Sequence, residues 1–468
     1  MQNWIGEQLV EKRIVTEEQF QMALKRQKLQ GGRIGQNLVA LHFITEEEVA
    51  AFFKMTPQPP QTVEETGLDI SFIADLIMKH VLFMGEFIIN DVVDKVKLPP
   101  SVVTKAIDKL RKDLLLEVKG ADQLSGFTYR FSLTDRGKNR STELFEISRY
   151  AGPAPVRLQK YREMVRVQTI KSVIVDEKSL NDAFSHLVVN EGLLKRLGPA
   201  VSSGKTMFLY GPAGNGKTAI AEAIGKVLPG TIYLPHAVLV ESEIITVYDP
   251  VNHIAVQPEL GAEEVDQRWI RVKRPVIMAG GELTLKALDL EFNPISKFYE
   301  APVQMKANNG LFIVDDFGRQ LVDPKKLLNR WIVPLERRTD IFTLHTGMKF
   351  EIPFDQLVVF STNIEPKDLV DEGFLRRIRY KFRIDHPTLQ EYEQIFKKMC
   401  EVNGITFKKD VFDYLIKDYY RKFNVKLNAC HPRDIIENIV DDAHYYNCSP
   451  ALTKETVLAA WENYFVEM

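Results

Sequence analysis

The sequence predicts an α/β protein whose largest unit is a parallel sheet with a C-terminal helical lid, preceded by two small domains. From Thr206 onward, short apolar runs alternate with amphipathic helical stretches, and this order builds parallel sheets. The glycine-rich sequence GPAGNGKT, residues 211–218, joins one apolar run to a helical stretch. Upstream, proline-rich breaks at residues 56–67 and 151–156 interrupt the helical pattern. These breaks predict the boundaries of the two smaller domains.

Composition sets broad limits on the protein. A chain of 468 residues, 45% of them hydrophobic, has room for about two to four domains. The formal net charge of −2 argues against a generally basic nucleic-acid binder. The 3 cysteines are too few for a disulfide framework, and no apolar run approaches the ~18 residues of a membrane span. We therefore expect a cytoplasmic protein without direct membrane insertion.

Residues 1–55 contain two copies of one pattern. WIGEQLVEKRIVTEEQFQMALKRQ begins at Trp4 and RIGQNLVALHFITEEEVAAFFKMT begins at Arg33, an offset of 29 residues. In each copy a helical stretch is followed by Thr-Glu-Glu, and the threonines Thr16 and Thr45 are good N-caps for a second helix. The sequence predicts two helical pairs that stack into a small all-α repeat domain. A proline-rich linker, residues 56–67, follows it.

Residues 68–150 predict three helices followed by a β-hairpin. Apolar residues recur at helical spacing between Ile70 and Val81, a short helix follows from Asn90, and a third begins at Ser101. LLLEVKG and FTYRFSLT then read as two strands. This order resembles a winged helix. Residues 66–150 carry 13 Lys and Arg against 12 Asp and Glu, so we favour a protein-contact or spacer role, and DNA binding stays the alternative.

The glycine-rich loop carries the strongest chemical signal. GPAGNGKT follows the apolar strand MFLY and precedes a helix, which is the context of a phosphate-binding P-loop. Its backbone N–H groups and the helix dipole favour phosphate. We expect Lys217 to contact the β- and γ-phosphates of ATP and Thr218 to ligate Mg²⁺. The predicted nucleotide-binding residues are Gly211, Pro212, Ala213, Gly214, Asn215, Gly216, Lys217, Thr218 and Ala219.

Two later strands end in polar side chains. LFIVDDFGR ends a strand in two acids, and we expect Asp315 to hold Mg²⁺ and Asp316 to polarise the attacking water. LVVFSTN ends in Asn363, whose amide can orient that water. In the ATPases that this strand resembles, a glutamate is more usual at the position of Asp316, so the shorter aspartate leaves the turnover rate open.

Several arginines are candidates for phosphate contacts, because their planar forks match phosphate oxygens and stay charged. Arg376 and Arg377 follow the asparagine strand, where the AAA+ ATPases, which this segment resembles, have an arginine that reaches the nucleotide of a neighbouring subunit; Arg337 and Arg338 are the alternatives. Arg433, in CHPRDIIENIV, is a candidate to contact ATP within its own chain.

These motifs, in this order, resemble the AAA+ ATPases over residues 157–468. The resemblance implies a nucleotide-binding core over residues 157–386, with an insertion near 232–300, and a helical lid over 387–468. It also implies Mg-ATP hydrolysis and assembly into a homo-hexamer. Asn363, Arg376 or Arg377, and Arg433 stand where that family has its sensor 1, arginine finger and sensor 2.

The N-terminal repeat resembles the cyclic-di-GMP-binding N-terminal domain of type II secretion and type IV pilus ATPases. That domain has tandem motifs of the form R-L-G-x-x-L-V-x-x-G ending in L-x-x-Q, and their period matches the offset of 29 residues. The matching residues are Gly6, Leu9, Leu24 and Gln27 in the first copy and Arg33, Gly35 and Leu38 in the second. The pattern departs at Trp4, Arg13 and Thr56. The module therefore has two interpretations, a cyclic-di-GMP site or a docking domain.

Three functions are consistent with these features. The first is an ATPase that remodels a protein partner in an envelope-linked secretion or pilus system. The second is a DNA-binding regulator that uses the winged helix. The third is a slow, nucleotide-gated scaffold, which the short Asp316 side chain leaves open.

Overall fold

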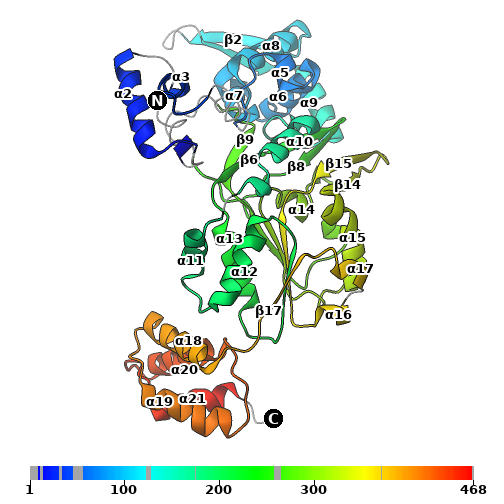
Figure 1. Cartoon of the computed structure of the whole chain (residues 1–468). Coiled ribbons are helices and arrows are strands. Elements are labelled where there is room, and N and C mark those ends of the chain that lie inside the picture. The colour runs from blue at the N-terminus through cyan, green and yellow to red at the C-terminus, as the bar shows by residue number, and fades with distance from the viewer. Residues whose placement is uncertain are drawn as a thin grey trace.

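The computed structural model describes residues 9–10, 14–30, 34–45, 56–122, 128–173, 175–257, 265–369 and 372–465. In Figure 1 the N-terminal helices and the middle domain lie at one end, the central sheet lies in the middle, and a separate group of C-terminal helices lies at the other end. The polypeptide thus runs from the small domains through the sheet to the lid.

Five parallel strands form the central sheet, in the order β10-β13-β16-β5-β17. The inner strands β5, β13 and β16 are almost completely buried, as expected for a parallel sheet covered on both faces. The α/β fold with a parallel sheet, predicted from the alternation after Thr206, is confirmed. The strands are β5 (Met207–Tyr210), β10 (Val276–Ala279), β13 (Leu311–Val314), β16 (Leu357–Thr362) and β17 (Tyr380–Arg383).

Helices cover both faces of the sheet, and alternate side chains of each strand pack against opposite helical layers. Met207 and Leu209 of β5 face the layer of α11 (Glu177–Phe184), α12 (Glu191–Ser202) and α13 (Lys217–Val227). The intervening Phe208 faces the opposite layer, where Trp331 of α15 (Pro324–Arg337) packs edge-on against Phe312 at 5.5 Å. Successive side chains of a strand point to opposite faces, so each strand contributes to both helical layers.

The insertion expected near residues 232–300 is interrupted by the central sheet. β10 lies within that range and pairs with β13 in parallel, so the insertion is two excursions from the core rather than one. Its other strands join β4 in a second sheet, β11-β12-β8-β7-β4, and form a two-stranded antiparallel sheet, β6-β9. The strands are β4 (Val156–Arg157), β6 (Thr231–Pro235), β7 (Ala237–Val240), β8 (Glu243–Thr246), β9 (Trp269–Lys273), β11 (Glu291–Asn293) and β12 (Phe298–Glu300).

Short elements complete the core. α10 (Leu158–Val167) packs on the second sheet, and the hairpin of β14 (Thr339–Thr343) and β15 (Lys349–Pro353) follows α15. The remaining short elements are η1 (Ile170–Ser172), η2 (Lys286–Leu288), α14 (Val303–Lys306), α16 (Pro366–Leu369) and α17 (Glu372–Leu375).

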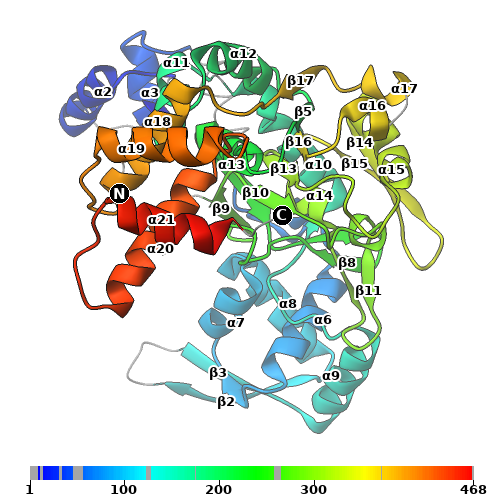
Figure 2. The same cartoon turned by 90° about the horizontal axis from the view of Figure 1, so that it is seen from below.

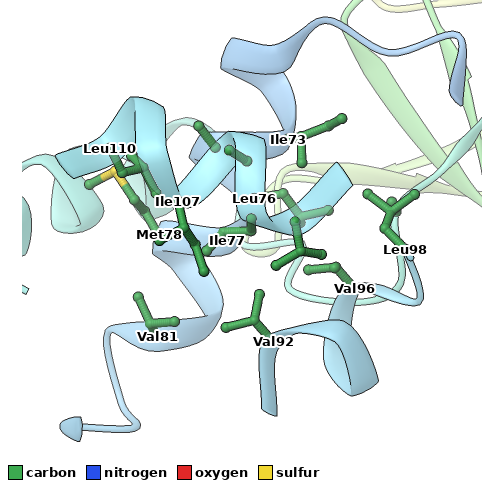
Figure 3. Close-up of a cluster of buried hydrophobic side chains, with 14 of the residues drawn as sticks. Ile73, Leu76, Ile77, Met78, Val81, Val92, Val96, Leu98, Ile107 and Leu110 are labelled. Atoms are coloured by element: carbon green, nitrogen blue, oxygen red, sulfur yellow. The ribbon is translucent and has the colours of Figure 1, made fainter. Parts of the chain in front are cut away.

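The middle domain has three helices followed by a hairpin, the order expected from the sequence. Apolar side chains at helical spacing on α6 pack against those of α7 and α8, as Figure 3 shows for Ile77, Val92 and Ile107. A third small strand completes the sheet β1-β3-β2. The elements are α6 (Ile70–Val81), β1 (Glu86–Phe87), α7 (Ile89–Val96), α8 (Pro100–Lys112), β2 (Leu116–Asp122), β3 (Thr128–Leu133) and α9 (Asp135–Ile147).

The core of the middle domain continues into the second sheet. Leu239 of β7 and Ile244 of β8 belong to the same buried cluster as the helices α6, α7 and α8. In Figure 2 this domain lies directly against the strands of the second sheet. The middle domain is therefore packed onto the second sheet rather than tethered to it.

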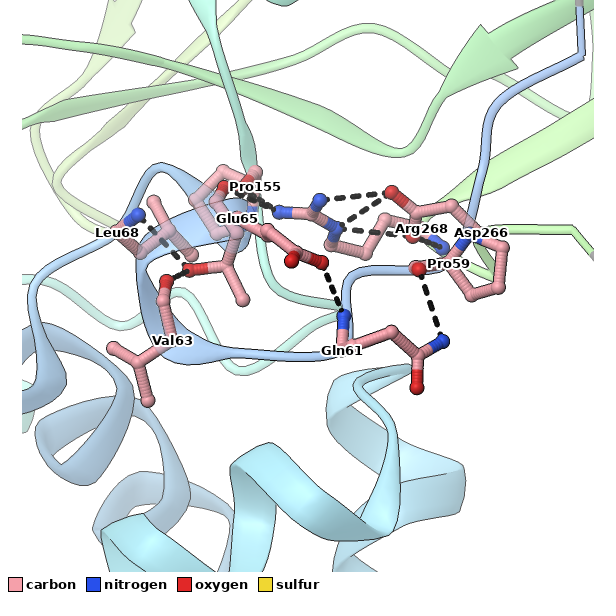
Figure 4. Close-up of polar contacts among 9 residues, drawn as sticks. Pro59, Gln61, Val63, Glu65, Leu68, Pro155, Asp266 and Arg268 are labelled. Atoms are coloured by element: carbon pink, nitrogen blue, oxygen red, sulfur yellow. Dashed lines mark hydrogen bonds and ion pairs between the residues drawn. The ribbon is translucent and has the colours of Figure 1, made fainter.

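The proline-rich linker is fixed by a buried ion pair. Arg268 and Asp266, both 4% exposed, pair through two nitrogens of the guanidinium, at 2.8 and 3.0 Å. The Arg268 guanidinium also donates to the carbonyl of Thr66 at 2.9 Å, and the Asp266 N–H donates to the carbonyl of Pro57 at 2.9 Å (Figure 4). The linker includes the short helix α5 (Val63–Thr66), capped by Thr62. A salt bridge beside the second sheet thus holds both ends of the linker.

The terminal helices form the two ends of the molecule. Near the N-terminus, α2 (Glu17–Gln30) and α3 (Ile34–Ala40) share a small core that includes Leu9, Phe20 and Leu38. The lid has its own core, built around Tyr392, Phe396 and Trp461. Its elements are α18 (Leu389–Val402), α19 (Lys409–Leu415), the π-helical turn η3 (Ile416–Arg421), α20 (His431–Tyr445) and α21 (Lys454–Tyr464). Within the described residues, every helix is too short or too polar to cross a membrane.

Candidate functional site

The P-loop connects β5 to α13 through three glycines with left-handed backbones. Gly211, Gly214 and Gly216 have φ values of 138°, 75° and 80°. A side chain on Gly211 would place its Cβ 2.2 Å from the carbonyl oxygen of Ile384, so the loop needs a glycine there for space as well as conformation. The turn ends at the first residue of α13, where free backbone N–H groups and the helix dipole favour an anion.

Lys217 is held over this loop. Its side chain is nearly buried, and its ammonium donates to the carbonyl of Pro212 at 2.8 Å. Burial lowers the pKa of Lys217, and the nearby Asp316 and Asp315 oppose that shift. The side chain is therefore positioned beside the anion cradle by a contact within the loop, and its contact with the phosphates of ATP stays a prediction.

A hydroxyl and a carboxylate meet next to the loop. Thr218 Oγ1 donates to Asp315 Oδ2 at 2.8 Å, which joins the first turn of α13 to the end of β13. Mg²⁺ is usually bound by one or two protein oxygens, with water and substrate phosphates completing its shell, so this pair fits a magnesium ion. In the part of the chain that the structure describes, there is no cluster of three or more His, Cys, Asp or Glu side chains that could form an all-protein metal site.

The second acid of the strand lies beside the predicted asparagine. Asn363 Nδ2 donates to Asp316 Oδ1 at 3.1 Å, because β13 and β16 are paired neighbours that end at the same edge. Asp316 adopts a left-handed backbone with φ of 47°, which turns its carboxylate out of the strand direction. Strain of this kind is common at functional sites.

A residue that the sequence motifs did not indicate stabilises this turn. The Gln320 amide donates to the carbonyls of Asp315 at 3.0 Å and of Asp316 at 3.3 Å, and its oxygen accepts from Gly318 N at 2.8 Å. Gln320 comes directly after the sequence DDFGR, and this proximity was the only signal in the sequence. It holds the two aspartates in place through their backbone.

The glycine loop between β5 and α13 and the polar strand ends beside it define the architecture. It is a P-loop α/β fold.

Arg376 and Arg377 lie beyond the amino ends of the strands, opposite the P-loop. Arg376 and Arg377 precede β17, whose amino end is level with that of β5, whereas the P-loop follows the carboxyl end of β5. These arginines therefore lie far from the P-loop of their own chain. Arg376 is exposed, whereas Arg377 pairs with Glu336 of α15 and donates to the carbonyl of Gly373 at 2.6 Å.

The two alternative arginines have different environments. Arg338 ends α15 with a left-handed backbone, and its guanidinium donates to the carbonyl of Gln356 at 2.9 Å and to that of Gly204. Burial lowers its pKa. Arg337 is exposed. Of the four candidates, Arg376 and Arg337 thus present their side chains to solvent, and Arg338 is a structural residue.

Backbone N–H groups of the lid donate hydrogen bonds to the P-loop. Cys430 N donates to the carbonyl of Gly214 at 2.9 Å, and Ala429 N donates to Asn215 Oδ1 at 3.1 Å. Asn215, predicted as a nucleotide contact, thus also holds the start of α20. Arg433 lies in the first turn of α20, where its side chain is 60% exposed and pairs with Asp434 at 2.9 Å; this hydrogen bond raises its pKa.

The predicted dinucleotide residues are described only in part. Leu9 and Leu38 are buried in the N-terminal core and Gln27 is 6% exposed, while Leu24 packs at its edge. Gly35 lies in α3. Trp4, Gly6, Arg13 and Arg33 lie outside the described residues.

Comparisons with known proteins support little beyond this description. A family described as a domain of unknown function (DUF8689) matches residues 388–463, which is almost the whole lid. No curated protein matches the chain. Among solved structures, NtrX from Brucella abortus is similar at 13% identity with a TM-score of 0.37, over 62% of this chain and 59% of NtrX.

A mutant of RuvB from Thermotoga maritima is similar at 12% identity with a TM-score of 0.33, over 63% of this chain and 72% of RuvB. A second RuvB structure, named a Holliday junction branch migration motor, has 13% identity and a TM-score of 0.31, over 65% of this chain and 74% of RuvB.

Proposed function

We propose that this protein is a magnesium-dependent ATPase of the AAA+ type. The observation that carries the proposal is the meeting of Lys217, Thr218, Asp315, Asp316 and Asn363 at one edge of the central sheet, around a glycine loop suited to phosphate. Ligands of open parallel sheets bind beyond the carboxyl ends of the strands, and these residues lie there.

Each side chain has a role that follows from its position. Lys217 exchanges its contact with the Pro212 carbonyl for phosphate oxygens when ATP enters. Thr218 and Asp315 hold the magnesium ion, which supplies neutralising charge to the phosphates when bound. Asp316 accepts a hydrogen bond from the attacking water and Asn363 orients the Asp316 carboxylate, because their side chains are 3.1 Å apart.

Arg376 completes the site of a neighbouring subunit in a ring, proposed as a homo-hexamer. Two observations support this role: the side chain is exposed, and it lies at the edge of the sheet opposite the P-loop of its own chain. Arg377 positions it by pairing with Glu336. Arg433 reaches ATP from the lid after leaving its pair with Asp434.

The work done by hydrolysis is proposed to be the remodelling of a protein partner. Asn215 couples the P-loop to the lid, so a change in loop occupancy alters the lid contact. An envelope-linked secretion or pilus system is the proposed setting, and cyclic di-GMP is the proposed regulator at the N-terminal domain. Both rest on the repeat pattern of residues 1–55.

The alternative, a DNA-binding regulator, is less well supported by the middle domain. Helix α8 would be the recognition helix, yet the linker covers its start: Ser101 Oγ donates to the carbonyl of Gln61 at 3.0 Å. A backbone hydrogen bond and one from Thr62 lower the pKa of Glu64 in the linker most, and the charge of Lys105 on α8 lowers it further. The linker would have to move for the start of α8 to enter a major groove.

Magnesium dependence tests the proposed chemistry. The wild-type chain should hydrolyse ATP only with Mg²⁺ present. Thr218→Ala should lower the hydrolysis rate roughly 10²- to 10³-fold, because one metal ligand is gone. Thr104→Ala, at an exposed position on α8, is the matched control and should leave the rate unchanged. Equal rates for Thr218→Ala and the wild type would exclude the assigned metal site.

A further inference from the structure

A second hollow lies on the core, away from the P-loop. It has a volume of about 510 Å³ and is formed by α10, η1, the end of α15 and the β14–β15 hairpin. Arg338, which lines it, donates to the main chain just before β5 and just before β16. The hollow therefore lies at the amino ends of the strands, whereas the P-loop lies at their carboxyl ends.

The lining of this hollow is strongly cationic. Five basic side chains meet two acidic ones, Glu351 and Asp355, so the local formal charge is 5 − 2 = +3. The buried Asp355 already accepts hydrogen bonds from Thr169 Oγ1 at 2.9 Å, Ile170 N at 2.8 Å and Asn309 Nδ2 at 2.7 Å. The five basic residues are Arg162, Arg166, Lys171, Arg337 and Arg338.

The cations divide into fixed and free groups. Arg162 and Arg338 are held by main-chain carbonyls, the first by that of Glu351 at 2.7 Å. Among the residues that the structure describes, no acid forms an ion pair with the side chains of Arg166, Lys171 or Arg337, and none of the three is buried. Like charges gathered in one hollow repel each other, and an anion between them removes that cost.

We propose that this hollow is a second ligand site, for a small molecule that carries two or more phosphate groups. Guanidinium forks match phosphate oxygens, and two of them are already held in place. The volume falls in the usual range for small-molecule pockets. A long nucleic acid fits less well, because the whole chain has a net charge of −2 and offers no general attraction to the rest of the strand.

Phosphates of this kind come from inorganic oligophosphates or from nucleotides, and calorimetry separates these sources. Full-length Lys217→Ala protein, in which the P-loop is disabled, is titrated with inorganic tripolyphosphate and separately with ADP. Binding of both supports the shared phosphate chemistry, and binding of ADP alone supports a nucleotide as the occupant. The test is independent of hydrolysis, so failure of the ATPase proposal leaves it intact.

Two further variants assign the binding to the hollow. Adding Arg166→Gln and Lys171→Gln should weaken tripolyphosphate or ADP binding about tenfold for each charged side chain removed. Lys160→Gln and Lys178→Gln remove the same charge from exposed positions outside the hollow and should change nothing. No binding to Lys217→Ala, equal binding after the Arg166 and Lys171 changes, or binding of a single-stranded oligonucleotide in place of both probes would each overturn the proposal.

Discussion

The buried pair of Arg268 and Asp266 gives a prediction whose size can be worked from the structure. Arg268→Ala removes the guanidinium and leaves the carboxylate of Asp266, 4% exposed, with the backbone N–H of residue 268 at 3.1 Å as its remaining donor from this pair. Leaving one member of a buried pair alone usually costs about 3 to 5 kcal/mol. The retained backbone donor favours the lower end, about 3 kcal/mol, although the substitution also removes the hydrogen bond to the Thr66 carbonyl.

Hydrogen exchange measures this cost locally. The amide of Asp266 donates to the carbonyl of Pro57, so it reports on release of the linker. A loss of about 3 kcal/mol speeds exchange roughly 10²-fold if opening is local. The double variant Asp266→Ala,Arg268→Ala removes both charges and should destabilise the protein less than the sum of the two single changes.

Two results would contradict a role for the Arg268–Asp266 pair in holding the linker. Exchange at Asp266 within about threefold of wild type in Arg268→Ala would show that the linker is held without the ion pair. Additive effects of Arg268→Ala and Asp266→Ala in the double variant would show that the two charges do not interact. Either result would refute the view that this pair fixes the linker beside the second sheet.

Three further predictions concern partners. Mixing Arg376→Ala,Arg377→Ala subunits with Lys217→Ala subunits should restore part of the ATPase activity, because mixed interfaces pair an intact arginine with an intact P-loop; a dead mixture of assembled subunits would exclude a trans arginine. Duplex DNA should bind weakly or not at all at physiological salt, because residues 66–150 are almost neutral; nanomolar binding with a steep salt slope would contradict this. If cyclic di-GMP binds the full chain, Arg33→Ala should weaken binding sharply; the absence of any melting shift with wild type at tens of micromolar ligand would leave the docking role.

The sequence was most informative where the chemistry is local. The P-loop, the acidic strand end and the asparagine strand each occupy a few consecutive residues, and a parallel sheet brings strand ends to one edge. Thr218 with Asp315, and Asp316 with Asn363, are pairs of residues that the motifs singled out and that the fold brings into contact; their roles with ATP and Mg²⁺ stay predictions.

Long-range contacts could not be predicted in the same way. The pairing of β10 with β13 depends on tertiary packing, so the sequence did not show that a strand of the central sheet lies within the expected insertion near residues 232–300. Arg338 was a finger candidate by its neighbours in sequence, yet it donates to Gly204, 134 residues away. Proline residues showed where the linker breaks a helix but not that Arg268 holds it. A single sequence does not show which distant carbonyl an arginine will reach.

Separation of ATP binding from hydrolysis tests the central claim most directly. Binding of ATP and its turnover are measured on three full-length proteins: wild type, Lys217→Ala and Asp316→Asn. Lys217→Ala should lose binding, whereas Asp316→Asn should bind ATP like wild type and turn over roughly 10² to 10³ times more slowly. Asp316→Asn keeps the shape of the side chain and its position 3.1 Å from Asn363, so a loss of turnover reports on the carboxylate charge. Normal turnover by Asp316→Asn, or unchanged ATP binding by Lys217→Ala, would contradict the assignment of this site.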